Sequence, residues 1–97
     1  MSLDKYFGKT WTREYTCHSL ASEVWEDLTG RTMAIGQYEC IDEPESPCIV
    51  FMSNNHRKDS HVGIFVDGRV IHLSVRGVQW IPVELLKMGF KEVSFYK

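Results

Sequence analysis

Apolar and polar residues alternate most clearly in Ser60–Ser74, where two runs rich in Val and Ile flank the dipeptide Asp67-Gly68. An Asp-Gly pair between two such runs is typical of a β-hairpin with a two-residue type I′ turn. This turn pairs Val66 with Arg69 and thereby fixes which residues of the two strands face each other.

The register of this hairpin separates an apolar face from a face that carries two histidines. Gly63 is expected opposite His72, and His61 opposite Ser74. Paired residues share a face of the sheet, as do residues two apart along a strand. One face therefore holds four apolar residues suited to a core: Val62, Ile64, Ile71 and Leu73. The other face holds His61 and His72 as diagonal neighbours, and Gly63 leaves space between the strands.

The residues from Cys17 to about Leu28 follow a helical pattern. Their apolar positions fall at i, i+4, i+5 and i+8 and form one stripe: Leu20, Val24, Trp25 and Leu28. Gly30 supplies a C-terminal stop, and Thr16 is a suitable N-cap. Cys17 is then the first helical residue, where free N–H groups and the positive end of the helix dipole favour a thiolate.

The remaining pattern predicts short elements joined by loops. Strands are expected at Pro47–Met52, Val78–Ile81 and Glu92–Tyr96, a short helix at Pro82–Leu86 ended by Gly89, and a helical turn or extended lead-in at Asp4–Trp11. Loops are expected at Thr12–Thr16, Arg31–Tyr38, the acidic Glu39–Ser46 and the polar Ser53–Asp59, in which His56 is expected to be exposed. One main helix and an antiparallel sheet of four or five strands make an α+β domain, 1–97.

Composition narrows the classes of function. The 97 residues suffice for a single compact core, and 43% hydrophobic and 25% charged residues are ordinary for a globular protein. The net charge is −2 and the chain has no Lys/Arg block, which argues against nucleic acid or an anionic membrane as a partner. No apolar run is long enough for a membrane span, and the N-terminus lacks the apolar region of a signal peptide. Export is therefore expected to need lysis or a dedicated secretion machine.

The three cysteines, Cys17, Cys40 and Cys48, favour reduced thiols over a disulfide framework, because their number is odd. A bridge between Cys40 and Cys48 is the weaker alternative. None of the His and Cys residues has the close spacing typical of a zinc site, so neither a metal nor another cofactor is expected.

Cys17 completes the site that the two histidines begin. Nucleophilic cysteine catalysis needs a thiolate, a histidine as base and acid, and a group that orients this histidine. A helix start packed against the hairpin brings Cys17 beside His61, with His72 behind it as the orienting group. From the residues alone, a buried cysteine and two hydrogen-bonded strand histidines remain the alternative.

Three segments resemble the NlpC-type cell-wall endopeptidases, a papain-like family of cysteine peptidases. Tyr15–Leu20 with the following Val24-Trp25 is similar to the family's nucleophile helix, and His61–His72 is similar to its H-V-G-I-Y hairpin that ends in a second histidine. Tyr6–Trp11 resembles the Y-x-G-x-x-W lead-in, especially of phage tail versions.

The resemblance implies a papain-like minimal core, with the nucleophile helix packed on a small antiparallel sheet, and a Cys17, His61, His72 triad. It implies that Tyr6 helps to line the oxyanion site, and His18, next to the nucleophile, is a candidate for substrate contact. The implied activity is hydrolysis of peptidoglycan stem peptides at a D-γ-glutamyl–diamino-acid bond. The implied setting is the bacterial cytoplasm or a phage virion, with phage tail proteins as partners and action on the cell wall after delivery.

The sequence also departs from the family pattern. Thr16 replaces the usual Asp or Asn, His18-Ser19 replaces a Ser/Trp-Gly pair, and Pro47-Cys48 replaces Gly-Asp. These changes bear mainly on substrate identity. Two alternatives stay open: a noncatalytic tail-assembly or binding component with the same fold, and an amidase or acyltransferase effector that uses the same Cys-His-His site.

Overall fold

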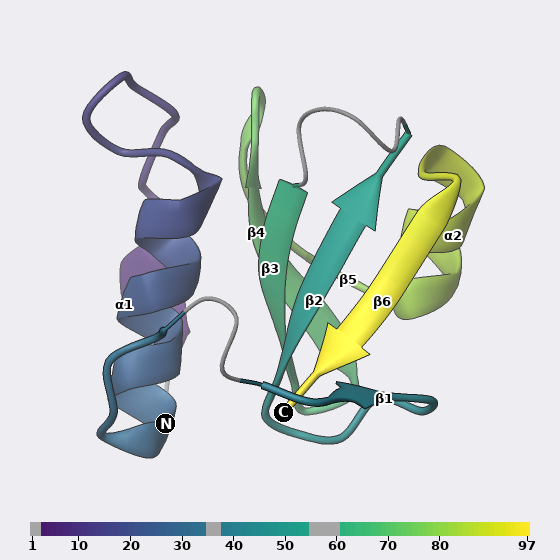
Figure 1. Ribbon diagram of the computed structural model, residues 1–97. Helices are drawn as coiled ribbons and strands as arrows, with labels where there is room; N and C mark the ends of the chain where they lie inside the picture. Colours follow the sequence, from purple (N-terminus) through teal and green to yellow (C-terminus); the bar gives the residue numbers. More distant parts are fainter. Residues whose placement is uncertain (1–2, 35–37, 55–60) are drawn as a thin grey trace.

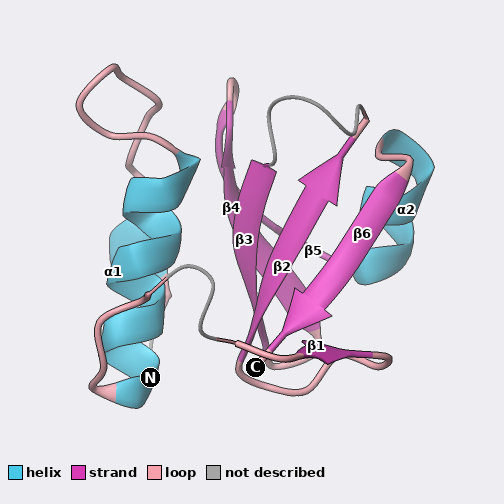
Figure 2. Ribbon diagram, in the orientation of Figure 1, coloured by secondary structure: helices cyan, strands magenta, loops and turns pink. Residues whose placement is uncertain are grey.

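The computed structural model describes residues 3–34, 38–54 and 61–97 of the chain. They form an α+β structure in which a six-stranded antiparallel sheet carries one long helix on one face and one short helix on the other (Figures 1 and 2). The α+β class expected from the sequence is therefore confirmed.

The long helix α1 spans Cys17–Thr29 and follows a 3₁₀ turn at Asp4–Tyr6. Thr16 is its N-cap in an extended conformation, and Ser19 Oγ accepts a hydrogen bond from the Thr16 N–H at 3.1 Å. Gly30 ends the helix in the left-handed conformation with φ of 72°, which glycine adopts without a steric penalty. Both helix ends predicted from the sequence are thus confirmed.

The sheet has the strand order β1-β6-β2-β3-β4-β5, and every neighbouring pair is antiparallel. Its strands are β1 (Cys40–Ile41), β2 (Cys48–Ser53), β3 (His61–Val66), β4 (Arg69–Ser74), β5 (Gly77–Ile81) and β6 (Glu92–Tyr96). The short helix α2, Val83–Gly89, connects β5 to β6 and begins after Pro82.

The hairpin β3–β4 has the predicted register. Val66 pairs with Arg69 and Gly63 with His72. Asp67 and Gly68 both have positive φ, 51° and 86°, as a type I′ turn requires. The two-residue turn therefore determines which face of the sheet carries the histidines.

Strand β1 lies in the acidic segment that was expected to be a loop, so that expectation is wrong for Cys40 and Ile41. Both residues pair with the C-terminal end of β6, and Glu39 and Lys97 exchange two further backbone hydrogen bonds beyond them. The edge of β6 supplies the backbone hydrogen-bond partners of β1. The acidic composition of the segment does not predict this pairing.

Two apolar clusters hold the helices on the sheet. The larger cluster lies under α1, and it includes the predicted apolar face of the hairpin: Val62, Ile64, Ile71 and Leu73. The smaller cluster, on the opposite face, includes Val70, Leu86 of α2 and Phe95. His61, Gly63 and His72 share the face of this second cluster, since Gly63 is paired with His72.

Candidate active site

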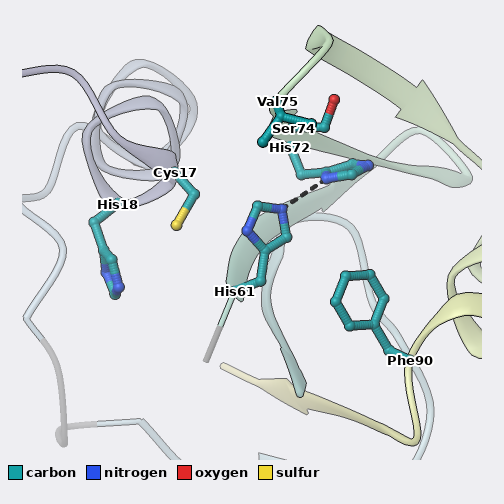
Figure 3. A pocket seen from close by; sticks show the side chains of 7 residues that line it. All are labelled: Cys17, His18, His61, His72, Ser74, Val75 and Phe90. Atoms are coloured by element: carbon teal, nitrogen blue, oxygen red, sulfur yellow. Dashed lines mark hydrogen bonds between the residues drawn. The ribbon is translucent and has the colours of Figure 1, made fainter. Parts of the chain in front are cut away.

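The predicted nucleophile and both histidines meet at one end of the sheet. There α1 and β3 begin and β4 ends (Figure 1). The histidines lie on the sheet face opposite α1. They therefore come close to the start of the helix only at this end of the sheet, where the strands no longer separate the two faces. The meeting point is a cleft of about 670 Å³, lined by Cys17, His18, His61, His72, Ser74, Val75 and Phe90 (Figure 3).

Cys17 is the first residue of α1 and is only partly buried. The first N–H groups of a helix have no partner within the helix, and the helix dipole is positive at this end. The Cys17 side chain leaves the helix on the side where His61 lies (Figure 3).

The two histidines are directly coupled. His61 Nε2 lies 2.8 Å from His72 Nδ1, with the ring planes nearly perpendicular at 86°. The remaining ring nitrogen of His61, Nδ1, is on the side that faces Cys17 (Figure 3). No hydrogen bond joins Cys17 to His61 in the described part of the chain.

Burial keeps both imidazoles neutral at pH 7. Burial, followed by the neighbouring His61, lowers the pKa of His72 from 6.5 to about 4, while Gln79 acts in the opposite direction. Burial also lowers the pKa of His61, with a smaller contribution from the charge of His18. A neutral His61 is able to accept a proton from a thiol.

Phe90 is a site residue that the sequence did not reveal. Its ring stacks on the imidazole of His61, with centroids 5.8 Å apart and planes inclined by 6°. Phe90 follows α2, and its position depends on how α2 returns the chain to β6. The local sequence Met88–Lys91 contains no signal for this contact. Ser74 and Val75, at the end of β4, were likewise not singled out as site residues.

Tyr6 is not brought to the cleft. Its side chain is buried in the cluster under α1, and its hydroxyl donates a hydrogen bond to the Asp27 carboxylate. Lys5 Nζ pairs with the same carboxylate at 2.8 Å. Since Asp27 lies near the C-terminal end of α1, this hydroxyl is at the opposite end of the helix from Cys17. The lead-in aromatic therefore serves as core and helix anchor, which does not support the expected oxyanion role.

His18, the candidate for substrate contact, lines the cleft together with Cys17. By contrast, His56 and most of the polar connection Ser53–Asp59, together with the first hairpin residue Ser60, lie outside the described residues.

The three cysteines are all free and differ in exposure: Cys17 is intermediate, Cys40 is exposed and Cys48 is buried. Burial raises the pKa of the Cys48 thiol. Among the described residues, no three His, Cys, Asp or Glu side chains are grouped so that they could hold a metal ion.

In the part of the chain that the structure describes, neither helix has the length and apolar character needed to cross a membrane. Comparison of the chain with protein-family models, curated proteins and solved structures finds no match in any of the three.

Proposed function

We propose that this chain is a cysteine peptidase that hydrolyses amide bonds in peptides of bacterial peptidoglycan. One observation carries the proposal: a helix-start cysteine and a neutral histidine share a cleft, and the second ring nitrogen of that histidine is bound by another histidine. A nucleophile, a base and an orienting group are the parts that thiol acyl chemistry needs.

The reaction begins with proton transfer from the Cys17 thiol to His61 Nδ1. The sulfur attacks the amide carbonyl carbon, and the Cys17 backbone N–H donates to the developing oxyanion. Each such donor typically contributes about 3 to 4 kcal/mol to the transition state. The carbon–nitrogen bond then breaks, and His61 Nδ1–H protonates the departing amine. A thioester between the acyl group and Cys17 remains.

Water completes the cycle. His61 Nδ1, neutral again, accepts a proton from a water molecule as its oxygen attacks the thioester carbonyl. The carbon–sulfur bond breaks, the thiolate recovers the proton from His61, and a carboxylic acid leaves. In this mechanism the proton on His61 Nε2 stays directed at His72 Nδ1, 2.8 Å away, so the His61 ring keeps its orientation throughout the cycle.

The substrate class rests on the sequence resemblance to NlpC-type endopeptidases. The two histidines of Ser60–Ser74 and the cysteine of Tyr15–Leu20 supply that resemblance. A D-γ-glutamyl–diamino-acid bond of the stem peptide is therefore the first bond to assay, and a phage tail is the proposed setting. A cleft of about 670 Å³ is within the usual size range for sites that bind small ligands, and so suits a short peptide.

The test is to incubate the full chain with purified muropeptides and to read the product masses. Hydrolysis gives two products whose masses sum to the substrate plus one water. We expect Cys17→Ala and His61→Ala to abolish these products while circular dichroism stays unchanged. Cys40→Ala, which removes an exposed thiol, should leave the turnover unaltered.

Three other results would contradict the proposal. Transfer products that carry an added amine would identify an acyltransferase. Retention of muropeptides without any product would identify a binding component. Unchanged turnover in Cys17→Ala would show that the cysteine is not the nucleophile.

A further inference from the structure

Among the described residues, His72 has one ring nitrogen bound and the other without a partner. Its Nδ1 contacts His61 Nε2 at 2.8 Å, but its buried Nε2 has no hydrogen-bond partner in the described part of the chain. The His72 side chain is only 4% exposed, so solvent does not readily satisfy this atom. A buried polar atom without a partner costs about 1 to 3 kcal/mol, and the surroundings of Nε2 therefore need an explanation.

The direction of the proton on each ring follows from the proposed chemistry. If His61 Nδ1 is to accept the Cys17 proton, the resting proton of His61 must be on Nε2. His61 Nε2–H then donates to His72 Nδ1, which must be bare. A neutral His72 consequently carries its own proton on Nε2 and presents a buried donor. An acceptor beside His72 Nε2 would hold the proton of each ring on Nε2. Without such an acceptor, both rings could instead carry their proton on Nδ1.

Gln79 is the residue placed to be this acceptor. It lies in β5 directly opposite His72 in β4, so the two side chains share a face of the sheet. Its influence raises the pKa of His72 against the effect of burial, as an acceptor of a ring N–H does. The two side chains do not meet hydrogen-bond geometry in this conformation, but facing residues in a sheet have Cβ atoms only about 5 Å apart.

Ser74, which also lines the cleft, already has hydrogen-bond partners. Ser74 Oγ donates to the Gly77 carbonyl at 2.9 Å and accepts from the Arg76 N–H at 3.1 Å within the β4–β5 turn. Gln79, by contrast, is partly buried in the edge strand β5. It faces His72 across the β4–β5 pair, and its side chain makes no hydrogen bond to His72 in this conformation.

We propose that Gln79 is a positioning residue, whose side-chain oxygen accepts the His72 Nε2–H and so sets the proton arrangement of both histidines. The inference rests on the proposed thiol chemistry for its purpose. Its physical content, however, is a tautomer that can be observed without any substrate. Gln79 reaches the sulfur only through His72 and His61, and it contacts no reacting atom.

The first measurement is the tautomer of His72 in the full-length protein, from ¹⁵N–¹H correlation spectra of histidine-labelled protein at pH 7. We expect the proton of His72 on Nε2 and the proton of His61 on Nε2. A His72 proton on Nδ1 would overturn the inference, whatever the activity of the protein.

The second measurement compares two variants of Gln79. Gln79→Met keeps the length of the side chain but removes the amide oxygen, and Gln79→Glu keeps an acceptor. Ile81→Met, two residues along β5, is the control for disturbance of the strand. The readouts are the His72 tautomer and the rate of Cys17 alkylation by iodoacetamide, with the exposed Cys40 as an internal reference.

In Gln79→Met we expect a mixed or reversed His72 tautomer and Cys17 alkylation slowed by about tenfold. This effect is far smaller than the ~10⁴-fold loss that follows removal of a residue that directly orients a catalytic histidine. Ile81→Met should keep the wild-type tautomer and alkylation rate. Gln79→Glu, whose carboxylate only accepts hydrogen bonds, should keep a proton on His72 Nε2 and raise the pKa of His72. An unchanged tautomer and rate in Gln79→Met would overturn the inference, as would equal losses in Met and Glu variants.

These outcomes are separable from failure of the proposed function. If wild-type Cys17 reacts no faster than Cys40, the thiol chemistry is absent, but the tautomer comparison still decides the role of Gln79. If Gln79→Met does not fold, the wild-type spectrum and the Glu variant still support or overturn the assignment.

Discussion

His61 Nε2 and His72 Nδ1 lie 2.8 Å apart, so the orientation of one imidazole is tied to that of the other. His72 is almost fully buried, whereas His61 reaches the cleft and stacks on Phe90. The buried ring of His72 is therefore the fixed member of the pair, and the more exposed ring of His61 is the member that contacts substrate in the proposed reaction.

Replacement of His72 tests this division of roles. An Asn side chain can place an oxygen near the position of His72 Nδ1, and a Leu side chain fills space without an acceptor. We expect His72→Asn to retain turnover within about tenfold, and His72→Leu to lose at least about 100-fold, since the orienting group of such a triad contributes up to ~10⁴-fold. The measurement is kcat/KM for muropeptide hydrolysis. Equal turnover in both variants would remove His72 from the mechanism.

Phe90 should control the basicity of His61. Its ring covers one face of the imidazole, and burial is the main cause of the lowered pKa of His61. Phe90→Ala admits water, so the pKa of His61 should rise toward its ordinary value of 6.5. NMR titration of the His61 ring protons measures this shift. Phe7→Ala is the matched control, because Phe7 is 42% exposed and does not line the cleft. A similar shift in both variants would refute a specific role of Phe90.

Gly63 is required by the close approach of β4. A Cβ atom at this position would lie 2.7 Å from the Ile71 carbonyl oxygen, 2.9 Å from Val70 Cγ1 and 3.0 Å from His72 Cβ. The nearest of these atoms belongs to the backbone of a central strand and cannot move without breaking the pairing. Gly63→Ala should therefore lower the free energy of unfolding by about 1 to 3 kcal/mol, as is typical of overpacking.

Chemical denaturation measures this loss, and Gly8→Ala is the control. A Cβ at Gly8 meets no atom of the described residues within 4 Å, so that variant should be close to the wild type. Gly63→Ala should also slow Cys17 alkylation, since β4 carries His72. If the two alanine variants had equal stability, the close packing at Gly63 would not be a real constraint.

Much of this site follows from local sequence signals. The Asp67-Gly68 turn sets the register, and the register alone puts His61 and His72 on one face. Thr16 and Gly30 delimit α1, which makes Cys17 the first helical residue. These features depend on turn and cap geometry, which a few neighbouring residues determine.

The features that the sequence did not reveal depend on distant partners. Cys40 and Ile41 form strand β1 because they pair with the edge of β6, which is distant in sequence. Phe90 contacts His61 because α2 packs on the sheet face opposite α1 and brings the chain back to β6 there. An aromatic lead-in is equally compatible with a core position and with a cleft position. Only the packing of Tyr6 under α1 distinguishes them.

Stability should fall as the pH decreases from about 6.5 to about 4. The pKa of His72 is lowered from 6.5 to about 4 in the folded protein, so between these values the unfolded chain binds more protons than the folded one. The contribution of neutral His72 to the free energy of unfolding is complete above pH 6.5 and lost below pH 4. Its size is about 3 kcal/mol. His61 has a lowered pKa as well and adds to the loss with the same sign.

The measurement is the free energy of unfolding across this pH range in the wild type and in His72→Asn, which cannot titrate. The variant should show a clearly shallower decline. Asp27, whose pKa is lowered by Lys5 and then by Tyr6, affects stability mainly below its ordinary pKa near 4 and does not obscure the comparison. Parallel curves for the two proteins would contradict a buried neutral His72.

Tyr6→Phe separates a core role from a role in catalysis. The phenol donates to Asp27 at the far end of α1, so its removal should cost about 1 kcal/mol of stability, as for a typical hydrogen bond whose acceptor keeps Lys5 as a partner. Turnover and Cys17 alkylation should be unchanged, because the ring stays buried under the helix. Asp27→Asn removes the acceptor charge and should show the same pattern. A loss of about 10²- to 10³-fold in kcat, with stability intact, would instead return Tyr6 to the oxyanion site.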